Sequence, residues 1–340
     1  MTDLTASPAT DPLSIYRYRD GLYAVDLTTA ALQLDFFTWL AAHPSTLAEI
    51  CAHHGWDERP VDVMTTLFAA NGWVHLESGV FHLTATAQEY LCSGSEWFLG
   101  PYYASLHDRP IARDFLEVLR SGKPAGWSGD KAAFDWHKAM EQEDFARSFT
   151  AAMDCRGRYL AQALAKKLDL TGRTQLLDIG AGSGIYACSI AAQHPHLKAV
   201  VFDQAPVDRI AGKLIAERGC ADRVSVTTGN MFEGLPLGSD VHLYSNVLHD
   251  WGMKEVKELL AASYSALPTG GLLIIHDAII NADKTGPLHV AEYSCLLMHS
   301  TQGKCYSVSE YADLLTEAGF TPGAYQDTMV GRGFILAAKV

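Results

Sequence analysis

The sequence lacks any long apolar run: none of its hydrophobic stretches approaches the roughly 20 residues that span a bilayer. The N-terminus also lacks the basic start and apolar core of a secretory signal. Seven cysteines are present, but they form no CxxC pair, which argues against a disulfide framework and a structural zinc site. We therefore expect a cytoplasmic protein with no membrane partner.

Basic residues are also scarce. Lys and Arg number 26 against 39 Asp and Glu, which gives a formal net charge of −13. Binding a phosphate backbone takes clustered Lys and Arg, so we expect no nucleic-acid partner. Hydrophobic residues make up 48% and charged residues 19%, as in ordinary globular proteins, and 340 residues favour two domains.

The first domain, residues 1–165, reads as mainly helical. Apolar residues recur at helical spacing in 30–42 and 57–71, and Thr46 and Glu49 are typical of a helix start. The following segment alternates apolar and polar residues around Ser78-Gly79, which predicts a hairpin. Helices and a hairpin indicate a winged helix. Residues 45–84 carry one Arg and no Lys, so a dimerisation or protein-binding module is favoured over DNA binding.

The second domain, residues 166–340, has a different pattern. Short runs rich in Val, Ile and Leu alternate with helical stretches, which predicts an α/β fold with a doubly wound, mostly parallel, Rossmann-like sheet. Such sheets bind ligands at the carboxyl ends of their strands. The predicted strands are TQLLDIGAG, KAVVFDQ, RVSVTTGN, DVHLYSN, GLLIIHDA and GFILAAKV.

The first of these strands ends in a glycine loop containing Asp178, Gly180, Gly182 and Gly184. A dinucleotide fingerprint, GxGxxG, would need its third glycine at Ile185, so the spacing argues against a nicotinamide oxidoreductase. An acidic residue beside the loop suits a ligand with a cationic or hydroxyl-bearing part. S-adenosylmethionine, which carries an amino group and a sulfonium, is such a ligand.

The next strands supply matching polar residues at their carboxyl ends. Asp203 ends the second strand, where a carboxylate suits two ribose hydroxyls. The third strand is followed by groups that suit an adenine ring, and the fourth leads to the same edge. The sequence therefore predicts an S-adenosylmethionine site that also includes Asn230, Met231, Phe232, Ser245 and Asn246.

These motifs, with LHDW, LPTGGLLIIHDA and YSVSEYADLLTEAGF, resemble the plant-type small-molecule O-methyltransferases and their bacterial relatives. The resemblance covers essentially the whole chain. It implies a homodimer formed through the N-terminal domain and an acceptor pocket walled by the segment Phe149–Met153. We expect acceptor contacts at Met153, Met298 and Arg17, although an exposed helix start is the plainer interpretation of Arg17. Trp136 and His137 are weaker candidates.

His249 and Asp250 follow the fourth strand in NVLHDW, where a methyl acceptor would lie. Histidine is the usual general base near neutral pH. In the family that this chain resembles, the matching histidine deprotonates a hydroxyl and is held by two acids. Asp277 matches the first acid. Cys305 stands where the second is expected, and a thiol is a poor partner for an imidazole N–H.

A different use of the same loop is metal binding. His249, Asp250 and His299 make up the ligand set of a facial-triad site for a divalent transition metal such as Zn or Fe. An α-keto acid chelated there would form an enolate whose β-carbon attacks the methyl group. This resembles the α-keto acid C-methyltransferases of bacterial antibiotic biosynthesis.

The sequence thus predicts an S-adenosylmethionine-dependent methyltransferase acting on a small molecule. It leans towards metal-assisted C-methylation of an α-keto acid, with O-methylation by His249 as the alternative. N- or S-methylation remains open. A non-catalytic, ligand-binding winged-helix regulator is the alternative from another class, and the acidic first half speaks against it.

Overall fold

The computed structural model describes residues 3–125 and 139–340, which form two compact units. The first, here called the sheet unit, comprises residues 1–12, 136–279 and 310–340. The second, the helical unit, comprises residues 13–135 and 280–309.

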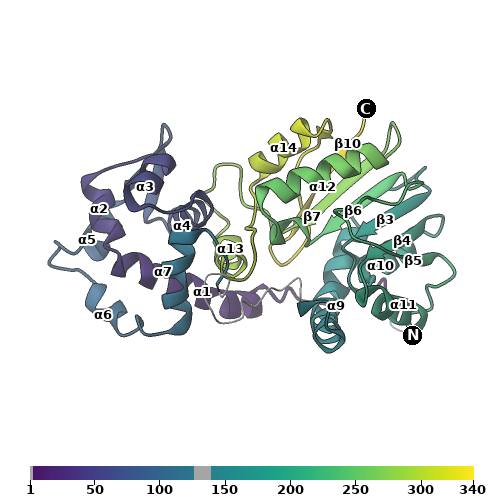
Figure 1. The fold of residues 1–340 in the computed structure, drawn as a ribbon, viewed down its shortest axis with the longest axis horizontal. Helices are drawn as coiled ribbons and strands as arrows, with labels where there is room; N and C mark the ends of the chain where they lie inside the picture. Colours follow the sequence, from purple (N-terminus) through teal and green to yellow (C-terminus); the bar gives the residue numbers. More distant parts are fainter. Residues whose placement is uncertain (1–2, 126–138) are drawn as a thin grey trace. The chain divides into compact units, whose positions relative to one another are not determined.

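The helical unit is built from helices that begin with side-chain caps. Thr46 and Glu49 form the expected capping box at α3, and Asp57 accepts a hydrogen bond from the backbone N–H of Arg59 at the start of α4. The unit contains α1 (Leu13–Gln33), α2 (Phe36–Ala42), α3 (Leu47–His54), α4 (Glu58–Ala70), α5 (Ala85–Leu91), α6 (Gly100–Ala104), α7 (Pro110–Ser121) and α13 (Leu288–Ser300) (Figure 1).

The expected hairpin is present between β1 (Val74–Glu77) and β2 (Val80–Leu83). Its two turn residues, Ser78 and Gly79, both have positive φ, 51° and 83°. A two-residue turn with positive φ at both positions matches the twist of the flanking strands. Helices α2 to α4 with this hairpin confirm the helical N-terminal region and the hairpin predicted at Ser78-Gly79.

Helix α13 packs within the helical unit, against α1, α4 and α7, although it lies late in the sequence. The buried guanidinium of Arg59 fixes the end of this helix by donating hydrogen bonds to the carbonyl oxygens of Met298, Thr301 and Gly303 at 2.7–3.3 Å. The two compact units therefore do not divide at residue 165, as the sequence led us to expect. Helix α13 comes after that residue but packs in the helical unit, and α9 (Glu143–Ala165) comes before it but belongs to the sheet unit.

The sheet unit holds an eight-stranded sheet in the order β5-β4-β3-β6-β7-β10-β8, with β9 paired to β10. Strands β3 to β7 are parallel, and β10 runs antiparallel to β7. The strands are β3 (Gln175–Ile179), β4 (Lys198–Asp203), β5 (Val224–Thr228), β6 (Val241–Ser245), β7 (Leu272–Asp277), β8 (Thr321–Pro322), β9 (Gln326–Asp327) and β10 (Gly333–Ala338).

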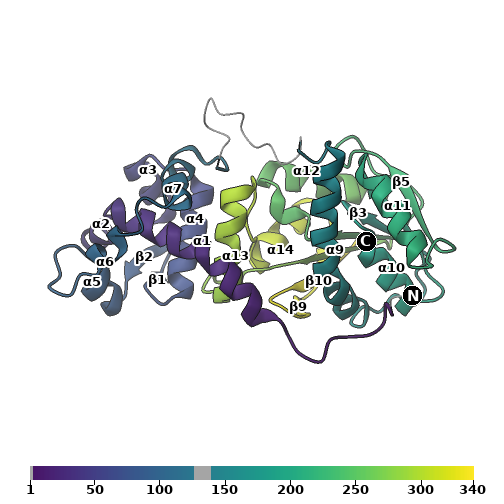
Figure 2. The same ribbon diagram turned by 90° about the horizontal axis from the view of Figure 1, so that it is seen from below.

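Helices cover this sheet as in a doubly wound fold. Helix α9 packs on α10 and α11, and the three lie together in Figure 2. Strand β3 lies between β4 and β6, so the strand order reverses there and opens a crevice at the carboxyl ends. The helices are α9 (Glu143–Ala165), α10 (Ile185–Gln193), α11 (Val207–Glu217), α12 (Met253–Ala266) and α14 (Val308–Glu317), with the short 3-10 helix η1 (Leu248–Asp250).

Within the described residues, every helix is too short or too polar to pass through a bilayer. The longest, α9 in the sheet unit and α1 in the helical unit, both carry charged side chains along their length.

Candidate active site

The glycine loop connects β3 to α10 through three residues in the left-handed region. Gly180, Gly182 and Gly184 have φ of 66°, 57° and 69°, values that side-chain-bearing residues rarely adopt. A Cβ at Gly184 would also lie 3.0 Å from Val201 Cγ2. This loop therefore needs glycine for its backbone conformation and, at Gly184, for close packing on β4.

Two buried carboxylates hold the loop in place. Asp178 Oδ2 accepts a hydrogen bond from the N–H of Ala187 in the first turn of α10, at 3.1 Å. Asp203 Oδ2 accepts one from the N–H of Gly182 at 2.8 Å. Burial raises the pKa of Asp178 to about 7 and that of Asp203 to about 6. A ligand that donates hydrogen bonds or carries positive charge would stabilise the ionised form of both carboxylates.

These residues line a cavity of about 310 Å³ that lies wholly in the sheet unit. Among the predicted cofactor residues, only Gly184 is absent from its wall, since it packs beneath the loop on β4 and α11. The structure therefore brings together the strand ends that the sequence pattern selected. The predicted residues on the wall are Asp178, Gly180, Gly182, Asp203, Asn230, Met231, Phe232, Ser245 and Asn246.

The segment after β5 forms one end of the cavity. Asn230 Oδ1 accepts a hydrogen bond from the N–H of Phe232 at 3.0 Å, which folds the segment into a tight turn. The ring of Phe232 meets the ring of Trp251 edge to face, with centroids 4.5 Å apart. These rings provide an apolar wall suited to a flat aromatic group.

Helix α9 contributes a row of side chains to the same cavity. Phe149, Met153 and Arg156 are spaced at i, i+4 and i+7, so they share one face of the helix. Met153 was expected from the sequence, whereas Arg156 was missed. The helical spacing from Met153 was the signal that could have found it, and its guanidinium is suited to a ligand carboxylate.

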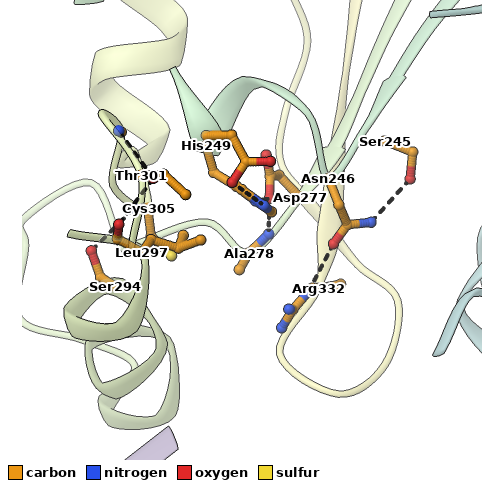
Figure 3. Close-up of polar contacts among 12 residues, drawn as sticks. Ser245, Asn246, His249, Asp277, Ala278, Ser294, Leu297, Thr301, Cys305 and Arg332 are labelled. Atoms are coloured by element: carbon orange, nitrogen blue, oxygen red, sulfur yellow. Dashed lines mark hydrogen bonds and ion pairs between the residues drawn. The ribbon is translucent and has the colours of Figure 1, made fainter. Parts of the chain in front are cut away.

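His249 is buried beside two carboxylates in the loop after β6. Its Nδ1 pairs with Asp277 Oδ1 (Figure 3). Its Nε2 lies 3.6 Å from Asp250 Oδ1. Burial acts to raise the pKa of Asp277, but the charge and hydrogen bond of His249 outweigh it, so this pKa lies below its usual value. Burial raises the pKa of Asp250. Asp277 is therefore the ionised partner of the imidazole.

Asp277 is itself held by two further donors. Its Oδ1 accepts a hydrogen bond from the N–H of Ala278 at 2.7 Å, and its Oδ2 accepts one from the hydroxyl of Tyr311 at 3.4 Å. Tyr311, on α14, is fully buried. The carboxylate expected to orient His249 is thus fixed on both oxygens. Tyr311 was not identified from the sequence because it lies in a separate helix with no spacing relation to Asp277.

Asn246 lies at the centre of another buried network at the cavity wall. Its Nδ2 donates to Ser245 Oγ at 3.2 Å, and its Oδ1 accepts from Arg332 Nε at 3.2 Å (Figure 3). The same Nδ2 donates to the Tyr186 hydroxyl at 3.0 Å. Ser245 Oγ also lies 2.8 Å from His276 Nδ1. Burial lowers the pKa of His276 to about 3, so this ring is neutral.

Three further predicted residues, Arg17, Met298 and His299, belong to the helical unit. His299 Nε2 lies 2.9 Å from Asp114 Oδ2, and Arg17 Nε lies 3.3 Å from Glu292 Oε2. Met298 is fully buried in α13. The N–H of Cys305 donates to Ser294 Oγ, a buried contact that a cysteine or a glutamate could equally make through its backbone.

The expected metal triad of His249, Asp250 and His299 finds no support in this arrangement. Across residues 3–125 and 139–340, the structure places no three His, Cys, Asp or Glu side chains together as metal ligands. Trp136 and His137 lie outside the described residues.

Comparison with known proteins decides the family. The model of the O-methyltransferase domain matches residues 117–321, which is more than half of the chain. The chain belongs to this O-methyltransferase family. It is therefore an S-adenosylmethionine-dependent methyltransferase, and not the non-catalytic regulator considered from the sequence.

Several relatives of this methyltransferase cover most of its length. It is 31% identical, over 88% of its chain and 86% of the relative, to a 3-hydroxy-5-methyl-1-naphthoate 3-O-methyltransferase from Streptomyces sahachiroi. It is 30% identical, over 90% and 86%, to an L-tyrosine C(3)-methyltransferase from Streptomyces lavendulae. The crystal structure of an O-methyltransferase family 2 protein from Planctomyces limnophilus in complex with apigenin is similar to this structure, with a TM-score of 0.91 and 30% sequence identity. The match covers 100% of this chain and 99% of the other.

The cavity of the methyltransferase fits the methyl donor that its family uses. The left-handed glycines leave the loop without side chains where a ligand must approach closely. Asp203 would hold ribose hydroxyls, Phe232 and Trp251 would pack on the adenine, and Arg156 would pair with the carboxylate. Among the described residues that line the cavity there is no Lys, and their buried charges are mainly acidic, which suits a ligand with a sulfonium and an amino group.

Proposed function

We propose that this enzyme methylates a hydroxyl group of a small aromatic molecule, with His249 as the general base. The observation that carries the proposal is the buried pair of His249 Nδ1 and Asp277, whose carboxylate is ionised and held on both oxygens. This is the arrangement of a base and its orienting acid. The O-methyltransferase relatives support the same reaction type.

The hydrogen bond to Asp277 selects the tautomer of His249. An ionised carboxylate only accepts, so Nδ1 carries the proton and Nε2 presents its lone pair. Nε2 can then take the proton of an acceptor hydroxyl, and Asp277 stabilises the imidazolium that results. Proton removal by a positioned base contributes typically about 10²–10⁴-fold in rate.

S-adenosylmethionine, when bound, supplies an electrophilic methyl group. The protein's own contribution is to hold that group and the acceptor oxygen in line, which lowers the activation free energy by several kcal/mol. Phe149 and Met153 of α9 give the cavity an apolar wall suited to an aromatic ring. Asp250, beside Nε2, can accept a hydrogen bond from the imidazolium N–H once the proton has been transferred.

The test is a screen of phenols with S-adenosylmethionine, in which apigenin and hydroxynaphthoic acids are the first acceptors. Mass spectrometry follows S-adenosylhomocysteine and a product heavier by one methylene unit. His249→Ala should lower kcat about 10²–10⁴-fold, whereas His43→Ala, an exposed imidazole in the helical unit, should leave it unchanged. Undiminished turnover by His249→Ala would contradict the proposal.

The alternative is carbon methylation, which two observations favour. Cys305 stands where the family's second acid is expected, and a relative 30% identical to this chain is named as a tyrosine C-methyltransferase. In the form that the sequence favours, His249, Asp250 and His299 would hold a transition metal, which would supply Lewis-acid chemistry for an α-keto acid. The expected consequence is that His299→Ala abolishes turnover of an α-keto acid as fully as His249→Ala does.

Metal content separates the two reactions. Elemental mass spectrometry of the purified, untagged protein should find about one transition metal per chain if the triad binds metal, and the metal should be lost in His299→Ala. For the O-methylation proposal we expect His299→Ala to retain turnover of a phenol, because its imidazole is paired with Asp114 in the helical unit.

We also propose that the chain forms a homodimer through α1. Four apolar side chains on this helix are 40–89% exposed and follow the 3-4-3 spacing of one helix face. They are Ile15, Tyr18, Leu22 and Val25. Light scattering after gel filtration should show a dimer that Leu22→Glu dissociates. Leu237 of the sheet unit, which is more exposed than Leu22, provides the control, Leu237→Glu, which should remain dimeric.

A further inference from the structure

Two loops at the carboxyl edge of the sheet contain side-chain-bearing residues in the left-handed region. Asn246, after β6, has φ of 55°, and Val330, before β10, has φ of 54°. Asparagine adopts this conformation more readily than most residues, but a β-branched residue almost never does. Val330 is also 2% exposed. Strained backbone persists only where its surroundings hold it, and it clusters at functional sites.

One side chain, Arg332, contacts both loops. Its Nε donates to Asn246 Oδ1 at 3.2 Å, and its Nη1 donates to the carbonyl oxygen of Val330 at 3.3 Å. The residue is 4% exposed. Its own backbone is fixed by hydrogen bonds to Thr328 and Met329, which turn the loop so that the guanidinium reaches Asn246. A buried guanidinium therefore joins the two strained positions.

The contact also decides how the amide of Asn246 is oriented. A guanidinium donates hydrogen bonds and never accepts, so Arg332 requires the amide oxygen on its side. The amide nitrogen then faces Tyr186 and Ser245, to which it donates. Asn246, Tyr186 and Ser245 all line the cavity. If the amide were reversed, its nitrogen would face the guanidinium, which only donates, and the amide could no longer donate to Tyr186 and Ser245.

We propose that Arg332 is a positioning residue for the methyl donor: by holding Asn246 in its strained conformation and fixing its amide, it preorganises the wall of the cavity. This rests on the proposal that the cavity binds S-adenosylmethionine. Arg332 itself does not line the cavity, so its effect passes through Asn246.

A purely electrostatic role for Arg332 makes a different prediction. Its charge also lowers the pKa of Asp277. If Arg332 acted only through this charge, loss of the guanidinium would lower kcat and leave the affinity for S-adenosylhomocysteine unchanged. Preorganisation of the wall instead requires that binding itself be weakened.

The experiment measures the affinity of the full-length protein for S-adenosylhomocysteine by calorimetry. Arg332→Met should weaken binding about tenfold or more, and Arg332→Lys, which keeps one donor, should lie between Met and wild type. Arg173→Met is the matched control, because Arg173 also donates to a backbone carbonyl, that of Gly270, away from the cavity. It should bind as wild type.

A double mutant separates positioning from general destabilisation. If Arg332 acts through Asn246, Arg332→Met combined with Asn246→Ala should bind no more weakly than Asn246→Ala alone. Additive losses, or wild-type affinity in Arg332→Met, would overturn the proposal. If Arg332→Met does not fold, Arg332→Lys carries the same comparison. No binding by the wild-type protein would instead refute the cofactor site, and the positioning role with it.

Discussion

The pairing of His249 with Asp277 allows the charge of the acid to be tested apart from its hydrogen bond. Asp277→Asn keeps an oxygen where Oδ1 accepts from His249 and from the N–H of Ala278. Its new amide nitrogen can donate to the hydroxyl of Tyr311, which now donates to Oδ2. The geometry should survive, and only the negative charge that stabilises the imidazolium is lost.

The magnitude follows from the two kinds of hydrogen bond. A bond to a charged group contributes about 1.5–3 kcal/mol and a neutral one about 0.5–1.5 kcal/mol, so the charge is worth about 1–1.5 kcal/mol. This corresponds to a roughly five- to twelvefold decrease in kcat for Asp277→Asn. Asp277→Ala also loses the bond, and its kcat should decrease roughly 12- to 160-fold.

The assay is kcat at saturating S-adenosylmethionine with an acceptor from the phenol screen, alongside the affinity for S-adenosylhomocysteine. That affinity should not change, because Asp277 does not line the cavity. Since the pKa of Asp277 lies below its usual value, the carboxylate is ionised at the neutral pH of this assay. Equal kcat values for wild type and Asp277→Asn would refute the role given to this charge.

Asp203→Asn should weaken S-adenosylhomocysteine binding about tenfold or more, while Asp222→Asn, on the exposed surface, should not. Because the pKa of Asp203 is about 6, wild-type affinity should decline below that pH as the carboxylate is protonated, and calorimetry should find a smaller decline in the variant, in which only Asp178 of the two carboxylates still titrates. Gly184→Ala should destabilise the fold more than Gly182→Ala in urea unfolding, because only the first adds a Cβ contact of 3.0 Å to a left-handed backbone; equal losses would contradict the packing argument.

Local sequence patterns predicted the parts of the fold that local chemistry controls. Thr46 and Glu49 form their capping box, and Ser78-Gly79 forms its turn, because each motif satisfies its own backbone. The residues predicted to bind the cofactor, except Gly184, line one cavity because parallel strands bring their carboxyl ends to one edge of the sheet. Gly184 is the exception, since it serves packing on Val201 and not the cavity wall.

Contacts that depend on tertiary packing could not be predicted in this way. Arg332 follows no motif, and its contact with Asn246 joins residues far apart in the chain. The sequence grouped His299 with His249 by residue type, but spacing cannot show whether side chains converge, and His299 pairs with Asp114 on α7 instead. Arg156 could have been predicted from the sequence, because it lies one turn beyond Met153 on the same helix face.

The place of α13 in the helical unit has a consequence for biogenesis. During synthesis, α1, α4 and α7 leave the ribosome first, yet the helix that completes their core follows only after strands β3 to β7 have all been made. N-terminal domains usually fold first as the chain emerges, but here the first helices must wait with their apolar faces uncovered. We therefore expect the nascent chain to bind chaperones that shield apolar surface. We also expect both units to complete their folding only at the end of translation.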